Sequence, residues 1–142
     1  MSLQTAPGPD LAEAETLAGK LVEWLEDGVR RDDLFAPDAF ADLSLPQWRV
    51  QANGADGLYH LREDDHPQSG RVHVERLEPT ASGFVIQFEE RWHHDGQEWY
   101  CREMIHAVVA SGLIREMAVY CTGDWDEPTQ QRHAAEVHLT RP

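Results

Sequence analysis

Residues 83–121 alternate between apolar and polar side chains in three successive stretches, a pattern typical of β-strands with one buried face. The stretches are Gly83–Trp92, Trp99–Val109 and Leu113–Cys121. Asp95-Gly96 separates the first two stretches and Ser111-Gly112 separates the last two, and both dipeptides favour two-residue hairpin turns. The segment therefore predicts two antiparallel hairpins that share their middle strand.

The two turns also predict which residues face each other across the strands. If Asp95 and Gly96 form the first loop, the predicted pairs are Trp92 with Trp99, Glu90 with Cys101 and Phe88 with Glu103. If Ser111 and Gly112 form the second loop, the predicted pairs are Glu103 with Tyr120, Ile105 with Ala118 and Ala107 with Glu116. The more apolar face, which should turn inward, then carries Glu103 in the middle of a strand. A slip of one residue in either turn would exchange the two faces.

The rest of the chain predicts helices before the sheet and one helix after it. Asp10 is placed as an N-cap with Glu13 at the capping-box position, and Gly28 marks the end of this helix. The other expected elements are a short helix over Asp33–Phe40, an irregular or partly extended segment over Leu43–Gly54, a helix over Asp56–Asp64, a strand over Arg71–Leu77, a helix over Asp126–Glu136 and a last short strand over Val137–Thr140. Helices followed by an antiparallel sheet indicate the α+β class.

The length and the charge of the chain narrow its organisation and its partners. The 142 residues suffice for one domain that buries about two-thirds of its unfolded surface. We expect residues 1–9 to be a disordered tail and residues 10–142 to form the single domain. The net charge of −14 argues against a nucleic-acid partner or an anionic membrane surface, because both require clustered Lys and Arg. No stretch resembles a membrane span or a signal peptide, so a cytoplasmic location is expected.

The cysteines and histidines predict neither a disulfide scaffold nor a metal centre. Two cysteines are too few for such a scaffold or for a closed zinc site. The predicted registers place Cys101 and Cys121 on opposite faces, so we expect free thiols in a reducing compartment. His93 and His94 point to opposite faces beside a turn, which disfavours chelation. No metal and no cofactor are therefore expected.

Three short segments, in order within residues 10–125, carry a family pattern. They are Leu34-Phe35-Ala36-Pro37-Asp38-Ala39, then Asn53-Gly54-Ala55-Asp56-Gly57-Leu58, then Ala110-Ser111-Gly112-Leu113-Ile114 followed by Met117-Ala118-Val119-Tyr120. Together they resemble the nuclear-transport-factor-2-like superfamily, especially its SnoaL-like and ketosteroid-isomerase-like members. The resemblance implies a cone-shaped curved antiparallel sheet wrapped around N-terminal helices, a cystatin-like α+β barrel that is usually dimeric. Such proteins include isomerases, cyclases, dehydratases, epoxide hydrolases and non-catalytic proteins, so the fold does not fix the function.

The acidic residues of these relatives do not transfer directly to this chain. The isomerases that it resembles place an Asp base five residues after the Asp of their Asp-Ala motif, which is Leu43 here, one position after Asp42. Their second acid corresponds to Met104, and the acid of SnoaL-like relatives corresponds to Ile105. The resemblance therefore disfavours steroid-type isomerisation.

The inward carboxylate of Glu103 is the main candidate for acid–base chemistry. Among apolar side chains it would lose hydration, which raises the pKa toward the range useful for a general acid or base. Tyr120, placed across the strand, would donate a hydrogen bond to Glu103 or to a substrate oxygen. Asp42 is a further catalytic candidate at the pocket mouth. The alternative is that Glu103 forms a structural ion pair, for example with Arg49, or lies at a wet rim.

The predicted walls of the cavity are aromatic and aliphatic. The candidate ligand-binding residues are Trp24, Trp48, Leu58, Phe88, Trp92, Trp99 and Ile105. Core packing is the alternative explanation for most of the tryptophans. Glu90 and Glu116 are expected at the rim, because they lie nearer the strand ends.

Two functional classes remain open. The first is a small enzyme that performs acid–base chemistry without a cofactor on a hydrophobic small molecule, of the isomerase, cyclase, dehydratase or epoxide-hydrolase type. The second is a non-catalytic dimeric module that binds a ligand in the same cavity or a protein partner on the outer sheet face. We expect a homodimer through that outer face, because a long exposed sheet needs a cover. The residues expected there are Tyr100, Arg102, Met104, Met117 and Val119.

Overall fold

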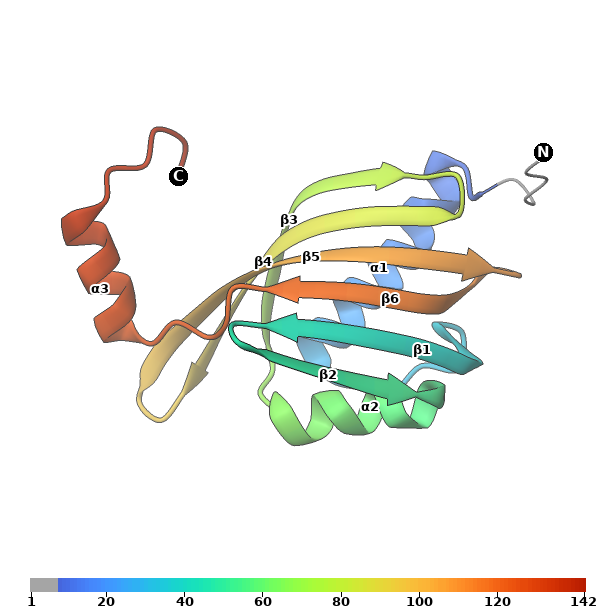
Figure 1. Ribbon diagram of the computed structural model, residues 1–142, viewed down its shortest axis with the longest axis horizontal. Helices are drawn as coiled ribbons and strands as arrows, with labels where there is room; N and C mark the ends of the chain where they lie inside the picture. The colour runs from blue at the N-terminus through green and yellow to red at the C-terminus, as the bar shows by residue number, and fades with distance from the viewer. Residues whose placement is uncertain (1–7) are drawn as a thin grey trace.

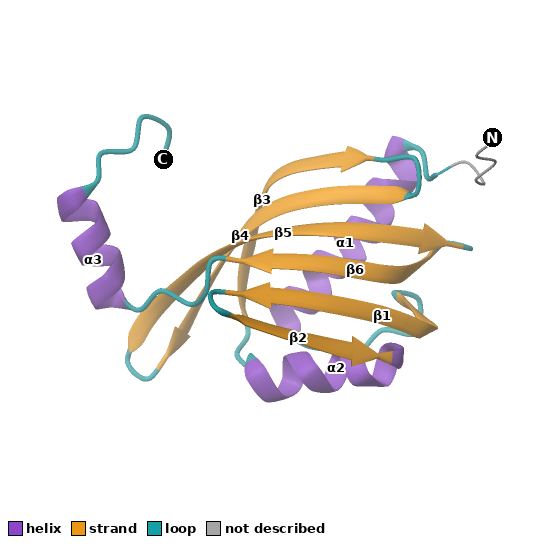
Figure 2. Ribbon diagram, in the orientation of Figure 1, coloured by secondary structure: helices purple, strands orange, loops and turns teal. Residues whose placement is uncertain are grey.

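The computed structural model describes residues 8–142, which form a curved sheet with two helices on one face and a third helix beyond its end (Figures 1 and 2). In chain order the elements are α1 (Leu11–Asp27), β1 (Phe35–Leu45), β2 (Trp48–Asn53), α2 (Gly54–Asp65), β3 (Gly70–Pro79), β4 (Gly83–His94), β5 (Gln97–Ala110), β6 (Leu113–Cys121) and α3 (Glu127–Glu136). The predicted α+β class is confirmed. Residues 1–7 of the predicted tail lie outside the described part of the chain.

The six strands follow the order β2-β1-β6-β5-β4-β3, and the sheet is mixed rather than fully antiparallel. The exception is β1, which runs parallel to β6. The short helix predicted over Asp33–Phe40 is wrong, because β1 begins at Phe35 and pairs with both β6 and β2. The backbone hydrogen bonds of this sheet outweigh the weak local helix signal. The sheet is curved and open, and it wraps around the helices as the predicted fold class requires.

The other three predicted helices and the strand predicted over Arg71–Leu77 are confirmed. In α1, the Asp10 carboxylate accepts a hydrogen bond from the backbone N–H of Glu13, and Gly28 ends the helix with a left-handed φ of 70°. The helix predicted over Asp56–Asp64 is α2, and the helix predicted over Asp126–Glu136 is α3. Residues 137–140 are not a strand in the described chain.

The register of the first hairpin is as predicted. Asp95 and Gly96 have φ values of 51° and 72°, the left-handed conformation that a type I′ turn requires. Across β4 and β5, the structure pairs Trp92 with Trp99, Glu90 with Cys101 and Phe88 with Glu103. The inward direction of Glu103 therefore follows from the turn chemistry.

The register of the second hairpin is predicted correctly only next to its turn. Val109 pairs with Ile114 as expected, but a β-bulge then shifts the pairing by one residue. Beyond the bulge Glu103 pairs with Cys121, and Met104 pairs with Tyr120. The residues of β6 that face inward are therefore Met117, Val119 and Cys121, in place of the predicted Glu116, Ala118 and Tyr120. The exchange places a more apolar set of side chains against the helices.

The helices α1 and α2 cover the inner face of the sheet, while α3 lies beside the far end of the β4–β5 hairpin (Figure 1). α1 buries an apolar stripe that consists of Ala14, Leu17, Ala18, Leu21, Trp24 and Leu25. α2 packs against β1 and β2, and α3 has no buried residue. No helix in residues 8–142 is long and apolar enough to cross a membrane.

Candidate functional site

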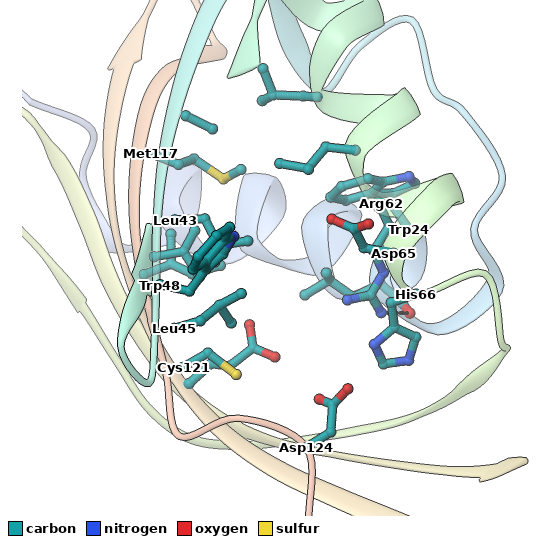
Figure 3. Close-up of a pocket in the computed structure, with 17 residues that line it drawn as sticks. Trp24, Leu43, Leu45, Trp48, Arg62, Asp65, His66, Met117, Cys121 and Asp124 are labelled. Carbon is teal, nitrogen blue, oxygen red and sulfur yellow. Dashed lines mark hydrogen bonds between the residues drawn. The ribbon is translucent and has the colours of Figure 1, made fainter. Parts of the chain in front are cut away.

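A cavity of about 390 Å³ lies between the inner sheet face and the two covering helices. Its lining residues are Trp24, Leu25, Ala41, Leu43, Leu45, Trp48, Leu58, Leu61, Arg62, Asp65, His66, Glu103, Ile105, Met117, Val119, Cys121 and Asp124. Figure 3 shows that Cys121, Asp124 and His66 gather at one end, whereas Met117 lies toward the other. The cavity is therefore apolar over most of its wall and polar at one end.

A buried ion pair joins α2 to β4 beside the polar end of the cavity. The Arg62 guanidinium donates to both carboxylate oxygens of Glu90, at 2.6 and 3.2 Å, and also donates to the backbone carbonyl of Leu25 at 2.8 Å. The side chains of Arg62 and Glu90 are only 14% and 4% exposed. Removing either partner would leave the other charge buried and unpaired, which is costly.

Glu103 lies beside this ion pair and faces the cavity. Burial, followed by the negative charge of Glu90 and a hydrogen bond between the two carboxyl groups, raises the pKa of Glu103 well above its usual value. Burial alone would also raise the pKa of Glu90, but the hydrogen bond from Glu103 and the charge of Arg62 outweigh it and lower that pKa. Of the two carboxyl groups, Glu103 is therefore the one that holds a proton more readily.

Two thiols lie on the same face as Glu103, which corrects their predicted separation. The Cys101 thiol donates to Oε1 of Glu103 at 3.1 Å, and the backbone N–H of Gly123 donates to the Cys121 sulfur at 3.4 Å. A hydrogen bond between the two thiols, followed by burial, raises the pKa of Cys101, while the same bond lowers the pKa of Cys121. The bulge in β6 brings them together, because it turns Cys121 inward.

Two further titratable groups face the polar end. Burial, followed by the charge of Glu90, raises the pKa of Asp124. Burial, followed by the charge of Arg62, lowers the pKa of His66 to about 4, so this imidazole is neutral at pH 7. The ring of His66 also packs against Trp92, with 4.2 Å between the ring centroids and a tilt of 49° between the planes. Asp124 and His66 are therefore available as proton acceptors close to Glu103.

The structure brings four of the seven predicted ligand-binding residues to the cavity. Trp24, Leu58 and Ile105 are buried in its wall, and Trp48 lies at its mouth with 70% of its surface exposed. The other three, Phe88, Trp92 and Trp99, do not line it. Phe88 is fully buried in the core, Trp92 lies behind His66, and Trp99 stacks on Trp92.

Of the three predicted catalytic residues, only Glu103 faces the cavity. The predicted position of Tyr120 is wrong, because the bulge turns it to the outer face, where it is 62% exposed. Asp42 does not line the cavity, since its carboxylate accepts two hydrogen bonds from Arg49 at the edge of the sheet. Arg49 therefore pairs with Asp42 and not with Glu103.

Sequence reasoning missed the arginine and the second acid of the site. Glu90 was expected at the rim, yet it is 3% exposed. Arg62 follows Leu58 by four residues and so shares its helix face, a periodicity that could have identified it. Asp124 and His66 follow the ends of β6 and α2, where no periodic pattern marks them.

Comparison with known proteins shows which solved structures share this fold. No protein-family model and no curated protein matches the chain. Among solved structures, it is similar to an LEH-like epoxide hydrolase of M. tuberculosis, with a TM-score of 0.63 and 13% identity over 80% of this chain and 85% of that one. An NTF-2 like protein of unknown function from Burkholderia xenovorans has a TM-score of 0.58 and 16% identity, over 90% of this chain and 95% of that one.

A third similar structure is a protein from Kribbella flavida that is proposed to be a ketosteroid isomerase. Its TM-score is 0.57 at 15% identity, and the match covers 92% of this chain and 93% of that one. At such low identity these likenesses establish the fold alone. The chain has the nuclear-transport-factor-2-like α+β fold, which confirms the expectation drawn from its sequence segments.

Proposed function

We propose that the cavity binds a small, largely apolar and uncharged molecule with one polar oxygen, and that the protein catalyses an acid–base reaction on it. The observation that carries this proposal is the position of the Glu103 carboxyl group, which lines the cavity beside the buried Arg62–Glu90 ion pair. Burial, followed by the charge of Glu90, raises the pKa of Glu103 well above its usual value. Glu103 therefore offers a neutral proton donor to a mostly apolar cavity.

The neighbouring side chains complete the proposed chemistry. Arg62 holds Glu90 in place through two hydrogen bonds, so the Glu90 charge acts on Glu103 from a fixed position. Glu103 donates a hydrogen bond, or its proton, to the substrate oxygen. Asp124 accepts a proton from the substrate or from a water molecule at the same end of the cavity. An acid and a base that flank one bound molecule suit isomerisation or epoxide opening.

The apolar wall sets the class of substrate. Leu43, Ile105 and Met117 contribute apolar side chains to the cavity wall. Among the described lining residues the only arginine, Arg62, is already paired with Glu90, and Asp65 and Asp124 also line the cavity, so an anionic ligand would be repelled. Two structures of the same fold are an LEH-like epoxide hydrolase and a proposed ketosteroid isomerase, and they support this class by analogy alone.

A small panel of reactions tests the proposal. Cyclohexene oxide reports hydrolysis to the diol, and 3-cyclohexen-1-one reports isomerisation to the conjugated ketone. We expect turnover of at least one compound, and we expect Glu103→Gln to lower kcat/KM by about 10²–10⁴-fold, the usual contribution of a general acid. Asp42→Asn, on the other side of the sheet, is the matched control and should leave turnover unchanged. Binding of the panel without turnover would instead support the non-catalytic ligand-binding module.

A further inference from the structure

Three potential metal ligands meet on the inner face of β5 and β6. Cys101, Glu103 and Cys121 each offer one ligand atom, and all three atoms lie within 4.8 Å of one another. Cys101 is buried, while Glu103 and Cys121 also line the cavity. This arrangement depends on the bulge in β6, because the predicted register would have put the two sulfurs on opposite faces.

We propose that Cys101, Glu103 and Cys121 form a binding site for a thiophilic divalent cation such as Zn²⁺. Two thiolates and one carboxylate are a donor set that zinc accepts, with metal–sulfur distances of about 2.3 Å and metal–oxygen distances of about 2.0–2.2 Å. Around an ion with such bond lengths the donor atoms lie less than about 5 Å apart, as they do here. Three protein ligands leave a fourth position, and it faces the cavity.

The position of the two cysteines on the strands favours an ion over a disulfide. Cys121 lies directly opposite Glu103, so Cys101 is displaced by two residues from the position opposite Cys121. Residues in such a diagonal relation have Cα atoms about 7–8 Å apart, which exceeds the usual span of a disulfide. An ion between the sulfurs bridges this separation without movement of the backbone.

The surrounding charges also suit a cation. The Glu90 carboxylate is neutralised by Arg62, whereas Glu103 has no basic hydrogen-bond partner among the described residues. Deprotonation of the two thiols and Glu103 would concentrate three negative charges in one buried place, and a divalent ion would offset most of that charge.

This inference goes beyond the proposed function and does not rest on it. The proton and the metal ion are alternative occupants of Glu103, so a bound ion would remove the proton donor from the cavity. Metal binding is measured without any substrate, and turnover is measured in the presence of a chelator. Failure of one proposal therefore leaves the other to be judged separately.

Cobalt(II) titration of the full chain tests the site, because Co²⁺ replaces Zn²⁺ and its thiolate complexes absorb in the near ultraviolet. We expect one equivalent of Co²⁺ to produce thiolate-to-cobalt absorption, which one equivalent of Zn²⁺ abolishes and excess Mg²⁺ does not. Cys121→Ser should weaken Zn²⁺ binding by more than about 100-fold, since even outer partners of a metal site cost about 10–100-fold. The double variant His93→Gln/His94→Gln controls for surface histidines and should bind as the wild type does.

The wild-type spectrum tests metal binding by the thiolates even if a cysteine variant fails to fold. Absence of thiolate absorption in the wild type, at a Co²⁺ concentration tenfold above that of the protein, would overturn the proposal. Retention of the full affinity in a folded Cys121→Ser variant would overturn it as well. An intramolecular disulfide that forms under mild oxidation without backbone disorder would contradict the argument from strand geometry.

Discussion

Two arginine–carboxylate pairs involve carboxylates of the same sheet but differ in their surroundings. Arg62 and Glu90 lie on the inner side, with 14% and 4% of their side chains exposed. Arg49 and Asp42 lie at the edge formed by β1 and β2, with 64% and 23% exposed. In both pairs the guanidinium donates to both carboxylate oxygens. The local chemistry is therefore the same, and the contrast lies in the solvent around it.

The difference shows why burial, rather than residue type, identifies the candidate site. Water screens the Arg49–Asp42 pair and replaces its hydrogen bonds when they break. The Arg62–Glu90 pair has no such substitute. Burial, followed by the charge of Glu90, raises the pKa of Glu103, and burial, followed by the charge of Arg62, lowers the pKa of His66 to about 4. A carboxylate thus becomes a candidate acid through its neighbours.

Removing the two arginines gives the largest expected contrast. Arg62→Met leaves the Glu90 charge buried without a partner and should lower the free energy of unfolding by roughly 3–5 kcal/mol. Arg49→Met removes an exposed pair and should cost about 1 kcal/mol or less. Urea denaturation of both variants at pH 7 checks the difference. Equal losses in the two variants would mean that burial does not separate the pairs.

Truncating two methionines tests which face of β5 and β6 turns inward. Met117 is 6% exposed and lines the cavity, whereas Met104 is 43% exposed on the outer face. Met117→Ala should lower the free energy of unfolding by about 2–4 kcal/mol, and Met104→Ala by less than about 1 kcal/mol. The same denaturation experiment applies. A larger loss in Met104→Ala than in Met117→Ala would mean that the position of the β6 bulge is wrong.

The depressed pKa of His66 predicts a loss of stability in mild acid. The imidazole has an ordinary pKa of 6.5 and a folded-state pKa of about 4, so the unfolded chain binds more protons between these values. Stability should therefore fall as the pH drops from about 6.5 to 4, by at most roughly 3 kcal/mol from this group. His66→Phe, which keeps a ring against Trp92, should show a shallower fall in urea denaturation across this range. Identical pH profiles of the wild type and the variant would mean that His66 does not have the depressed pKa.

A substitution on the outer face should have the smallest effect on the free energy of unfolding of the single chain, but it should change the assembly of the protein. We propose a homodimer through this face, where Met104 and Tyr120 are paired across the strands and both are exposed. Met117 and Val119, expected there from the sequence, point inward instead and are removed from the proposed surface. Sedimentation should give about 32 kDa, twice the chain mass of 16.2 kDa, and Tyr120→Glu should give the single-chain mass. A wild-type mass near that of one chain would contradict the proposal.

The parts of the fold that the sequence predicted are those with local signals. Asp95 and Gly96 dictate a type I′ turn, and every pair of the β4–β5 hairpin follows from it. The capping interactions of Asp10 and Gly28 likewise depend on residues within a few positions. By contrast, β1 is a strand because of its partners in the sheet, which the local sequence does not reveal.

The candidate site was predicted only in part, because only some of its residues are positioned by local signals. The first hairpin turned Glu103 inward, but the bulge in the second exchanged Tyr120 for Cys121. A signal for the bulge was present, because Ile114, Met117 and Val119 form an apolar face only if one extra residue lies between the first two. The burial of Glu90 by Arg62 joins an early helix to a later strand, a long-range contact that no short pattern encodes.

A crystal structure with a bound unreactive ketone tests the central claim most directly, namely that Glu103 presents a proton to an apolar cavity. Cyclohexanone offers one oxygen acceptor and an otherwise apolar ring. We predict that it lies in the cavity against Ile105 and Met117, with its oxygen about 2.5–3.0 Å from a Glu103 carboxyl oxygen, the distance of an O–H···O hydrogen bond. A ketone bound elsewhere, or a Glu103 side chain directed into bulk solvent, would contradict the account.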